Sequence, residues 1–132
     1  MTRIKDKKEE IHNYLDELEK IVPEDFEEYK NNHLVKAACE RYFEKIMNAV
    51  TDLGFIIIKE NKLKVPEEEK ELFDILEQEN IVNKELARKL KEARGMRNII
   101  AHQYGKINDE IVFEAITSEL IKDVGEFLDL LK

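Results

Sequence analysis

The chain has 132 residues, of which 42% are hydrophobic and 39% charged, and its formal net charge is −8. This length and hydrophobic content are those of one globular domain with its own core, so we expect a single helical domain over residues 1–132. The chain has one cysteine, Cys39, which excludes an intrachain disulfide and a cysteine-based metal site. Together with the lack of an apolar signal core near the N-terminus, this indicates that the protein is located in the cytoplasm. The longest apolar stretch, Phe55–Ile58, is too short to cross a bilayer.

Hydrophobic residues recur with the period of an α-helix along almost the whole chain. We predict a first helix from about Thr2 to Ile21, ended by Pro23. A second is predicted over roughly Glu24–Ile58, with a bend near Asn31–Asn32. Its β-branched end, GFIIIK, continues the apolar stripe of the helix and has no evident partner strand, so we expect it to be helical.

After a loop, a third helix is expected from Pro66, a residue suited to a first helical turn, to about Asn80. Asn83 is placed to cap a fourth helix, which runs to about Tyr104, and Asn108 caps a fifth. Short connections between long amphipathic helices make neighbours antiparallel. The sequence therefore predicts an all-α fold, an antiparallel four-helix bundle with an additional short helix.

The fourth predicted helix is the most basic part of the chain. Seven basic and two acidic residues lie between positions 84 and 106, so this segment carries +5 and the rest of the chain −13. Because local charge matters more than net charge for attracting a phosphate backbone, Lys91, Arg94 and Lys106 are candidates for nucleic-acid contacts. A run of charges is also typical of a solvated helix face, and taken alone the segment favours that simpler interpretation.

Arg97 interrupts the apolar stripe of this helix, where an arginine is costly unless it is paired or faces a wet cleft. It could pair with a carboxylate of the second helix, Asp52 being best placed, while His102 complements the helix dipole and Tyr104 packs in the core. The alternative is a functional Arg97 and His102. These lie about 140° apart on an ideal helix, so a long side chain, a bend near Gly95 or a second subunit must bring them together. We also expect Gly95 to permit the close approach of another backbone.

The segment GMRNIIAHQYGKI, residues 95–107, resembles the R-x4-H-x-Y motif of the HEPN superfamily, in particular its HepT toxins. The resemblance extends to Ala38–Ile58, which is similar to the family's second helix with its aspartate at Asp52, and to the region that follows it. Two positions depart from the pattern. Gln103 stands where the family often has an acidic residue, and Asn48 stands where relatives often carry a glutamate.

The resemblance implies a metal-independent endoribonuclease toxin with its site between two subunits of a homodimer. His102 would take the proton of the RNA 2′-hydroxyl and Arg97 would stabilise charge on the phosphate, supported by Asn98 and Asp52, with no metal and no cofactor. It further implies a partner, a cognate nucleotidyltransferase antitoxin that transfers AMP to Tyr104. The adduct adds bulk and negative charge, which should repel RNA.

Two other functions remain open at this point. The chain could be a non-catalytic, substrate-binding partner subunit of a nucleotidyltransferase, or a purely structural dimerisation bundle. The enzyme is favoured over the partner subunit by the presence of Arg97, His102 and Tyr104. The excess of basic residues in the fourth predicted helix disfavours a purely structural bundle. A neighbouring nucleotidyltransferase gene would fit both the enzyme and the partner subunit, so separating those two requires an activity test.

Overall fold

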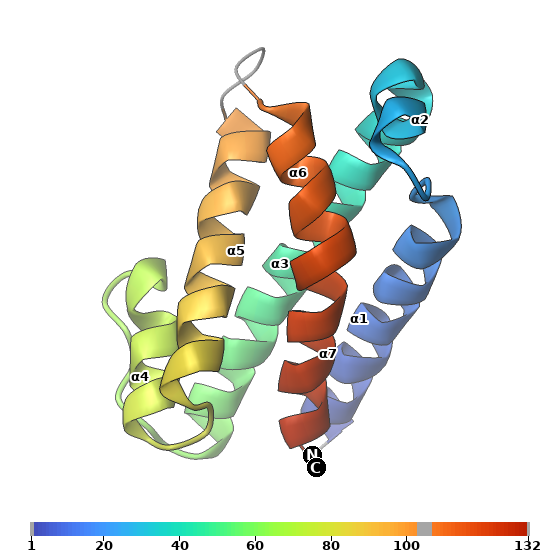
Figure 1. The fold of residues 1–132 in the computed structure, drawn as a ribbon. Helices are drawn as coiled ribbons and strands as arrows, with labels where there is room; N and C mark the ends of the chain where they lie inside the picture. Colours follow the sequence, from blue (N-terminus) through green and yellow to red (C-terminus); the bar gives the residue numbers. More distant parts are fainter. Residues whose placement is uncertain (1, 103–106, 132) are drawn as a thin grey trace.

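The computed structural model describes residues 2–102 and 107–131, and every regular element in these two ranges is a helix (Figure 1). Three of the four bundle positions are held by α1 (Thr2–Ile21), α3 (His33–Glu60) and α5 (Lys84–His102). The fourth is a continuous run of α6 (Asp109–Ala115), η2 (Ile116–Leu120) and α7 (Ile121–Leu130). Successive members run in opposite directions, so the two ends of the chain lie at the same end of the molecule (Figure 1). The predicted antiparallel four-helix bundle is confirmed.

Two short helices lie outside this bundle. The helix α4 (Leu72–Gln78), preceded by the 3-10 turn η1 (Glu69–Glu71), packs against α3 and α5. The helix α2 (Phe26–Asn31) packs against α3 and α6 at the opposite end (Figure 1). The core between the long helices is built mainly from apolar side chains, among them the fully buried Phe43, Ile46, Met47, Leu53 and Phe127. The GFIIIK segment lies inside α3, as predicted.

The second predicted helix is broken rather than bent. Asn32 is extended (φ −117°, ψ 95°), and its side chain accepts a hydrogen bond from the backbone N–H of Val35 at 3.1 Å. Asparagine competes for backbone hydrogen bonds in this way and is therefore a favoured N-cap. Residues 26–31 consequently form a separate short helix, capped by Asp25, whose carboxylate accepts from the N–H of Glu28 at 2.8 Å.

The third predicted helix begins later than expected. Pro66 is buried and lies before the helix, Glu68 is extended, and regular α-helix starts only at Leu72. The buried side chain of Leu72 packs directly over Gly54 of α3: a Cβ atom built on Gly54 would lie 2.6 Å from Leu72 Cδ2. The missing side chain of Gly54 thus lets the start of α4 approach α3 closely, which fixes the position of η1 beside it.

The fifth predicted helix contains a π-helical turn, η2, which the hydrophobic pattern did not predict. The Thr117 hydroxyl donates to the carbonyl of Phe113 at 2.9 Å, the local competition for backbone carbonyls that threonine makes within helices. The buried residues Val112, Ile116 and Leu120 follow one another at intervals of four. Because a π turn holds more residues than an α turn, it keeps this four-residue spacing on the core-facing side.

Within the described residues, no helix is both long enough and apolar enough to cross a membrane.

Candidate functional site on helix α5

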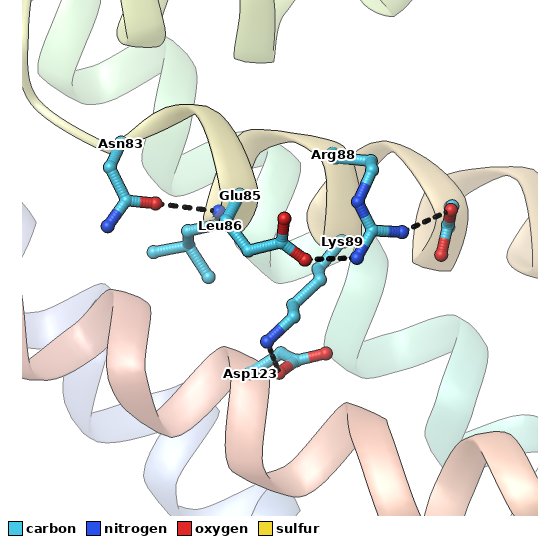
Figure 2. Close-up of polar contacts among 7 residues, drawn as sticks. Asn83, Glu85, Leu86, Arg88, Lys89 and Asp123 are labelled. Carbon is cyan, nitrogen blue, oxygen red and sulfur yellow. Dashed lines mark hydrogen bonds and ion pairs between the residues drawn. The ribbon is translucent and has the colours of Figure 1, made fainter.

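The helix α5 begins where the sequence predicts. The Asn83 side chain accepts a hydrogen bond from the N–H of Leu86 at 2.8 Å, which caps the first turn (Figure 2). Leu86, Ala87 and Leu90 are buried, while the residues between them are mostly charged. The helix therefore presents one side to the bundle and carries the basic residues on the others.

Three basic residues in the first half of α5, Arg88, Lys89 and Lys91, are paired with carboxylates (Figure 2 shows the first two). Arg88 bonds to Glu85 and to Glu92, the latter at 2.7 Å, and Lys89 lies 3.7 Å from Asp123 of α7. Burial raises the pKa of Asp123, an effect that Lys89 partly offsets. Lys91, a candidate for nucleic-acid contacts, donates to Asp74 of α4 at 2.7 Å. Acidic groups of other elements, here Asp123 and Asp74, thus offset part of the positive excess counted along the sequence.

Arg97 lies on α5 with only 13% of its side chain exposed. Its Nη1 donates to the Asn48 side-chain oxygen on α3, and its Nη2 donates to Glu69 Oε1 of η1 at 2.5 Å. Its Nε is buried and has no hydrogen-bond partner among the described residues. The same Glu69 oxygen accepts from Arg94 Nε at 2.8 Å. Two guanidinium groups therefore share one carboxylate oxygen.

The pairing of Arg97 with Asp52 is wrong. Asp52 lies on α3 with 64% of its side chain exposed, and its carboxylate lies 3.7 Å from Lys7 Nζ of α1. Asn48, one helical turn earlier on α3, takes the place beside Arg97 that Asp52 was expected to have. The supporting role of Asp52 therefore finds no contact with Arg97 in the structure.

The expectation for Gly95 is also wrong within this chain. A Cβ atom built on Gly95 meets nothing within 4 Å, so no neighbouring backbone approaches it. Gly95 is exposed, as are Ile99 and His102, and intervals of four and three residues place these three on one side of α5. The exposed side of α5 therefore has no side chain at Gly95 and an apolar side chain, Ile99, beside His102.

His102 is the last residue of α5 and is exposed, and Asn98, one turn earlier, is half-buried. No hydrogen bond joins His102 to Arg97 in the described part of the chain, and the Arg97 guanidinium is directed towards Arg94, one turn nearer the start of α5. Tyr104 and Lys106 lie outside the described residues. The single chain thus presents Arg97 and His102 on one helix without bringing them together.

Glu69 is the residue of this cluster that sequence reasoning missed. It is one of three consecutive glutamates directly after Pro66, where a helix was expected to begin, and nothing in its spacing indicated Arg97 as its partner. Burial alone would raise the pKa of Glu69, but hydrogen bonds from Arg94 and Arg97 outweigh it, so the pKa lies below its ordinary value. Glu69 is therefore ionised at neutral pH.

Within the described residues, the site presents the imidazole of His102 and the guanidinium of Arg97. No group of three or more histidine, cysteine, aspartate or glutamate side chains within residues 2–102 and 107–131 is placed to hold a metal ion. An exposed imidazole can accept a proton near neutral pH, and a guanidinium can bind two oxygens of a phosphate. These are the groups that cleavage of a phosphodiester by its own 2′-hydroxyl requires.

Solved structures share this fold. The bundle matches a tri-AMPylated Shewanella oneidensis HEPN toxin in complex with an MNT antitoxin, with a TM-score of 0.89, 23% identity, and coverage of 97% of this chain and 95% of that one. It matches a toxin–antitoxin structure with AMP-PNP with a TM-score of 0.91, 21% identity, and coverage of 99% and 98%. The chain therefore has the fold of the HEPN toxins.

The sequence comparisons identify the family. The HepT-like ribonuclease family matches residues 11–131. The mRNA nuclease HepT of Shewanella oneidensis is 26% identical over 108 residues, which cover 82% of this chain and 80% of that protein. The tRNA nuclease HepT of Aphanizomenon flos-aquae is 29% identical over 110 residues, 83% and 75% of the two chains. The chain belongs to the HepT-like ribonuclease family.

Proposed function

We propose that this chain is the endoribonuclease toxin of a toxin–antitoxin pair, with His102 as general base and Arg97 as the phosphate-binding cation. The observation that carries the proposal is the placement of the R-x4-H pair. Arg97 is a largely buried, hydrogen-bonded guanidinium, and His102 is an exposed imidazole at the end of the same helix. Membership of the HepT-like family supports the same activity. The buried free thiol of Cys39 is compatible with a cytoplasmic protein.

The proposed reaction uses the nucleophile that RNA itself carries. The His102 imidazole removes the proton of a 2′-hydroxyl, and the oxygen attacks the adjacent phosphorus. A 2′,3′-cyclic phosphate forms, and the 5′-oxygen of the next nucleotide leaves and takes a proton from water. Arg97 stabilises the charge that grows on the non-bridging phosphate oxygens. Asn48 holds the Arg97 head from α3, and Asn98 lies one turn before His102 on the same helix. None of these steps needs a metal ion.

Cleavage of labelled RNA in the presence of EDTA tests this proposal. His102→Ala is expected to lose about 10²–10⁴-fold in rate, and Arg97→Ala about 10²–10³-fold. His12→Ala and Arg41→Ala are matched controls, because His12 and Arg41 are exposed residues of α1 and α3 and are expected to leave the rate unchanged. Equal rates for wild type and His102→Ala would exclude the proposed base. A wild type that cuts no RNA yet binds a nucleotidyltransferase would favour the alternative, a non-catalytic partner subunit.

A homodimer about α5 is the second part of the proposal. Gly95 and Ile99 are exposed beside His102, and the open space over Gly95 would let the α5 helix of a second copy approach closely. Such packing would place His102 of each subunit at the interface, whereas Arg97 faces α3 and η1 on the other side of α5. Light scattering at micromolar concentration is expected to show a dimer for wild type and a monomer for Ile99→Glu. Leu34→Glu is the matched control, since Leu34 is more exposed, at 84%, but lies on α3. A monomeric wild type would refute this part.

Control by AMP transfer to Tyr104 from a cognate nucleotidyltransferase is the third part. The solved HEPN toxin of Shewanella oneidensis is AMPylated and bound to its MNT antitoxin. Tyr104 follows His102 by two residues, as the H-x-Y motif requires, and a phosphodiester there would compete with RNA for Arg97. Intact-mass analysis after incubation with the antitoxin and ATP is expected to show AMP on wild type and none on Tyr104→Phe. Equal AMP addition to both would refute the assignment.

A further inference from the structure

The most unusual polar contact in the described residues is the one that Glu69 makes. Its Oε1 accepts from Arg94 Nε at 2.8 Å and from Arg97 Nη2 at 2.5 Å, so two guanidinium groups converge on a single anionic oxygen. The two arginine side chains are 22% and 13% exposed, and that of Glu69 is 38% exposed. The carboxylate is thus the most solvent-accessible member of the group.

Two like charges one turn apart on a helix repel, and side chains in that situation usually separate into solvent. Here they lie together because an anion lies between them. Asn48, the other group bonded to Arg97, is neutral, so the local charge is +1 with Glu69 in place and +2 without it. A pair of guanidinium groups that converges on one oxygen, with a net positive charge, is also the arrangement that binds a phosphate.

Glu69 is held over the arginines by the chain around it. It lies three residues before Leu72, whose side chain packs on Gly54, and three residues after the buried Pro66. The glutamate itself belongs to η1, a single 3-10 turn of three residues. Its side chain can therefore leave the arginines by rotating into solvent, without displacing α3 or α5.

From this arrangement we propose that Arg94 and Arg97 form one phosphate-binding site, occupied in the free protein by the carboxylate of Glu69, which a phosphate must displace. The inference rests on the proposed ribonuclease function and adds to it a second arginine and an internal competitor. A phosphate that binds here replaces the Glu69 carboxylate at Arg94 and Arg97. Glu69 therefore lowers the affinity of this site for RNA, and it excludes anions whose charge is too weak to displace it.

The test compares two charge-neutral substitutions in the same segment. Glu69→Gln removes the competing charge. Glu68→Gln is the matched control, because Glu68 lies next to it, is 63% exposed and, among the described residues, is paired only with Lys70 at 3.7 Å. Both are made in a His102→Ala background, so that RNA is bound but not cut. We expect Glu69→Gln to bind a short fluorescent RNA about fivefold more tightly than Glu68→Gln in fluorescence anisotropy, the size of a partly exposed ion pair. Raising the salt concentration should narrow the difference.

Equal affinities would overturn the proposal, and weaker binding by Glu69→Gln would overturn it too, by showing that the carboxylate only orients the arginines. A second probe, inorganic pyrophosphate, requires no RNA recognition. Its titration, followed through the Nε–H signal of Arg94 by NMR, is expected to saturate at lower concentration in Glu69→Gln than in Glu68→Gln.

The two probes separate failure of this site from failure of the proposed function. Tighter pyrophosphate binding by Glu69→Gln, in a protein whose wild type cuts no RNA, would keep the site and reject the ribonuclease proposal. If wild type cuts RNA but Glu69→Gln changes the affinity for neither RNA nor pyrophosphate, the ribonuclease function stands and the proposed phosphate site is rejected.

Discussion

Two glycines in the middle of long helices should respond in opposite ways to the same substitution. In Gly95→Ala the new methyl group enters open space, because nothing lies within 4 Å of the Cβ position. Alanine is the better helix former by about 1 kcal/mol, so the free energy of unfolding should rise by about that amount. In Gly54→Ala the same gain is present, but the methyl group would lie 2.6 Å from Leu72 Cδ2 and 3.1 Å from its Cγ.

Leu72 is fully buried, so its side chain cannot move aside freely. Overpacking of this kind costs about 1–3 kcal/mol, which leaves Gly54→Ala less stable than wild type by about 1 kcal/mol once the helix gain is subtracted. The melting temperatures should move by about 4 °C in opposite directions.

Urea and thermal unfolding followed by circular dichroism measure both variants. The comparison is made at low protein concentration, because association would stabilise the folded state by mass action. A Gly54→Ala protein as stable as Gly95→Ala would show that Leu72 does not restrict the space over Gly54, and the close approach of α4 to α3 would then not depend on this glycine.

Three further predictions concern single contacts. Burial raises the pKa of Asp123, so the stability that this group contributes is present at acid pH and is lost as the pH rises through the folded-state pKa. In urea unfolding measured at several pH values, the stability of Asp123→Asn relative to wild type should therefore increase between about pH 4 and pH 7. A difference that does not change with pH would contradict this. Burial raises the pKa of Cys39 to about 11, so its thiol should react with a thiol reagent only after unfolding, and rapid labelling of the native protein would contradict its burial. Asn32→Ala should lower the free energy of unfolding by about 1 kcal/mol through loss of the α3 cap, whereas the neighbouring Asn31→Ala should have little effect.

Much of the fold could be predicted because it depends on patterns within each segment. The helical period of the hydrophobic residues, with Pro23 after it, placed α1 correctly at both ends. Asn83 and Asn108 cap the helices that they were expected to cap. The errors fall where one residue decides between two local structures. Asn32 can continue a helix or cap a new one, and Pro66 can begin a helix or be buried before it; the choice depends on what packs against the segment.

The site divides in the same way. A pattern within one helix pointed to Arg97 and His102. An arginine on an apolar stripe needs a partner, and the R-x4-H-x-Y motif places a histidine five residues after it. The partners themselves come from α3 and η1, across 49 and 28 residues of sequence. Asp52 was chosen as the carboxylate because it lies on the right helix, but it is directed to Lys7 of α1. Helical spacing gives the face of a residue and not the identity of the side chain that meets it.

Charge counted along the sequence is misleading for the same reason. Residues 84–106 carry an excess of positive charge, yet within the described part of this segment Arg88, Lys89, Lys91, Arg94 and Arg97 each lie within 4 Å of a carboxylate. Paired charges contribute little field beyond a few ångströms, and the net charge of −8 opposes the approach of RNA at longer range. Under the proposed function, RNA recognition would depend on short-range exchange, in which a phosphate takes the place of a carboxylate already bound to an arginine. A substrate that presents its phosphates in the geometry of those carboxylates would then be favoured over one that only carries more charge.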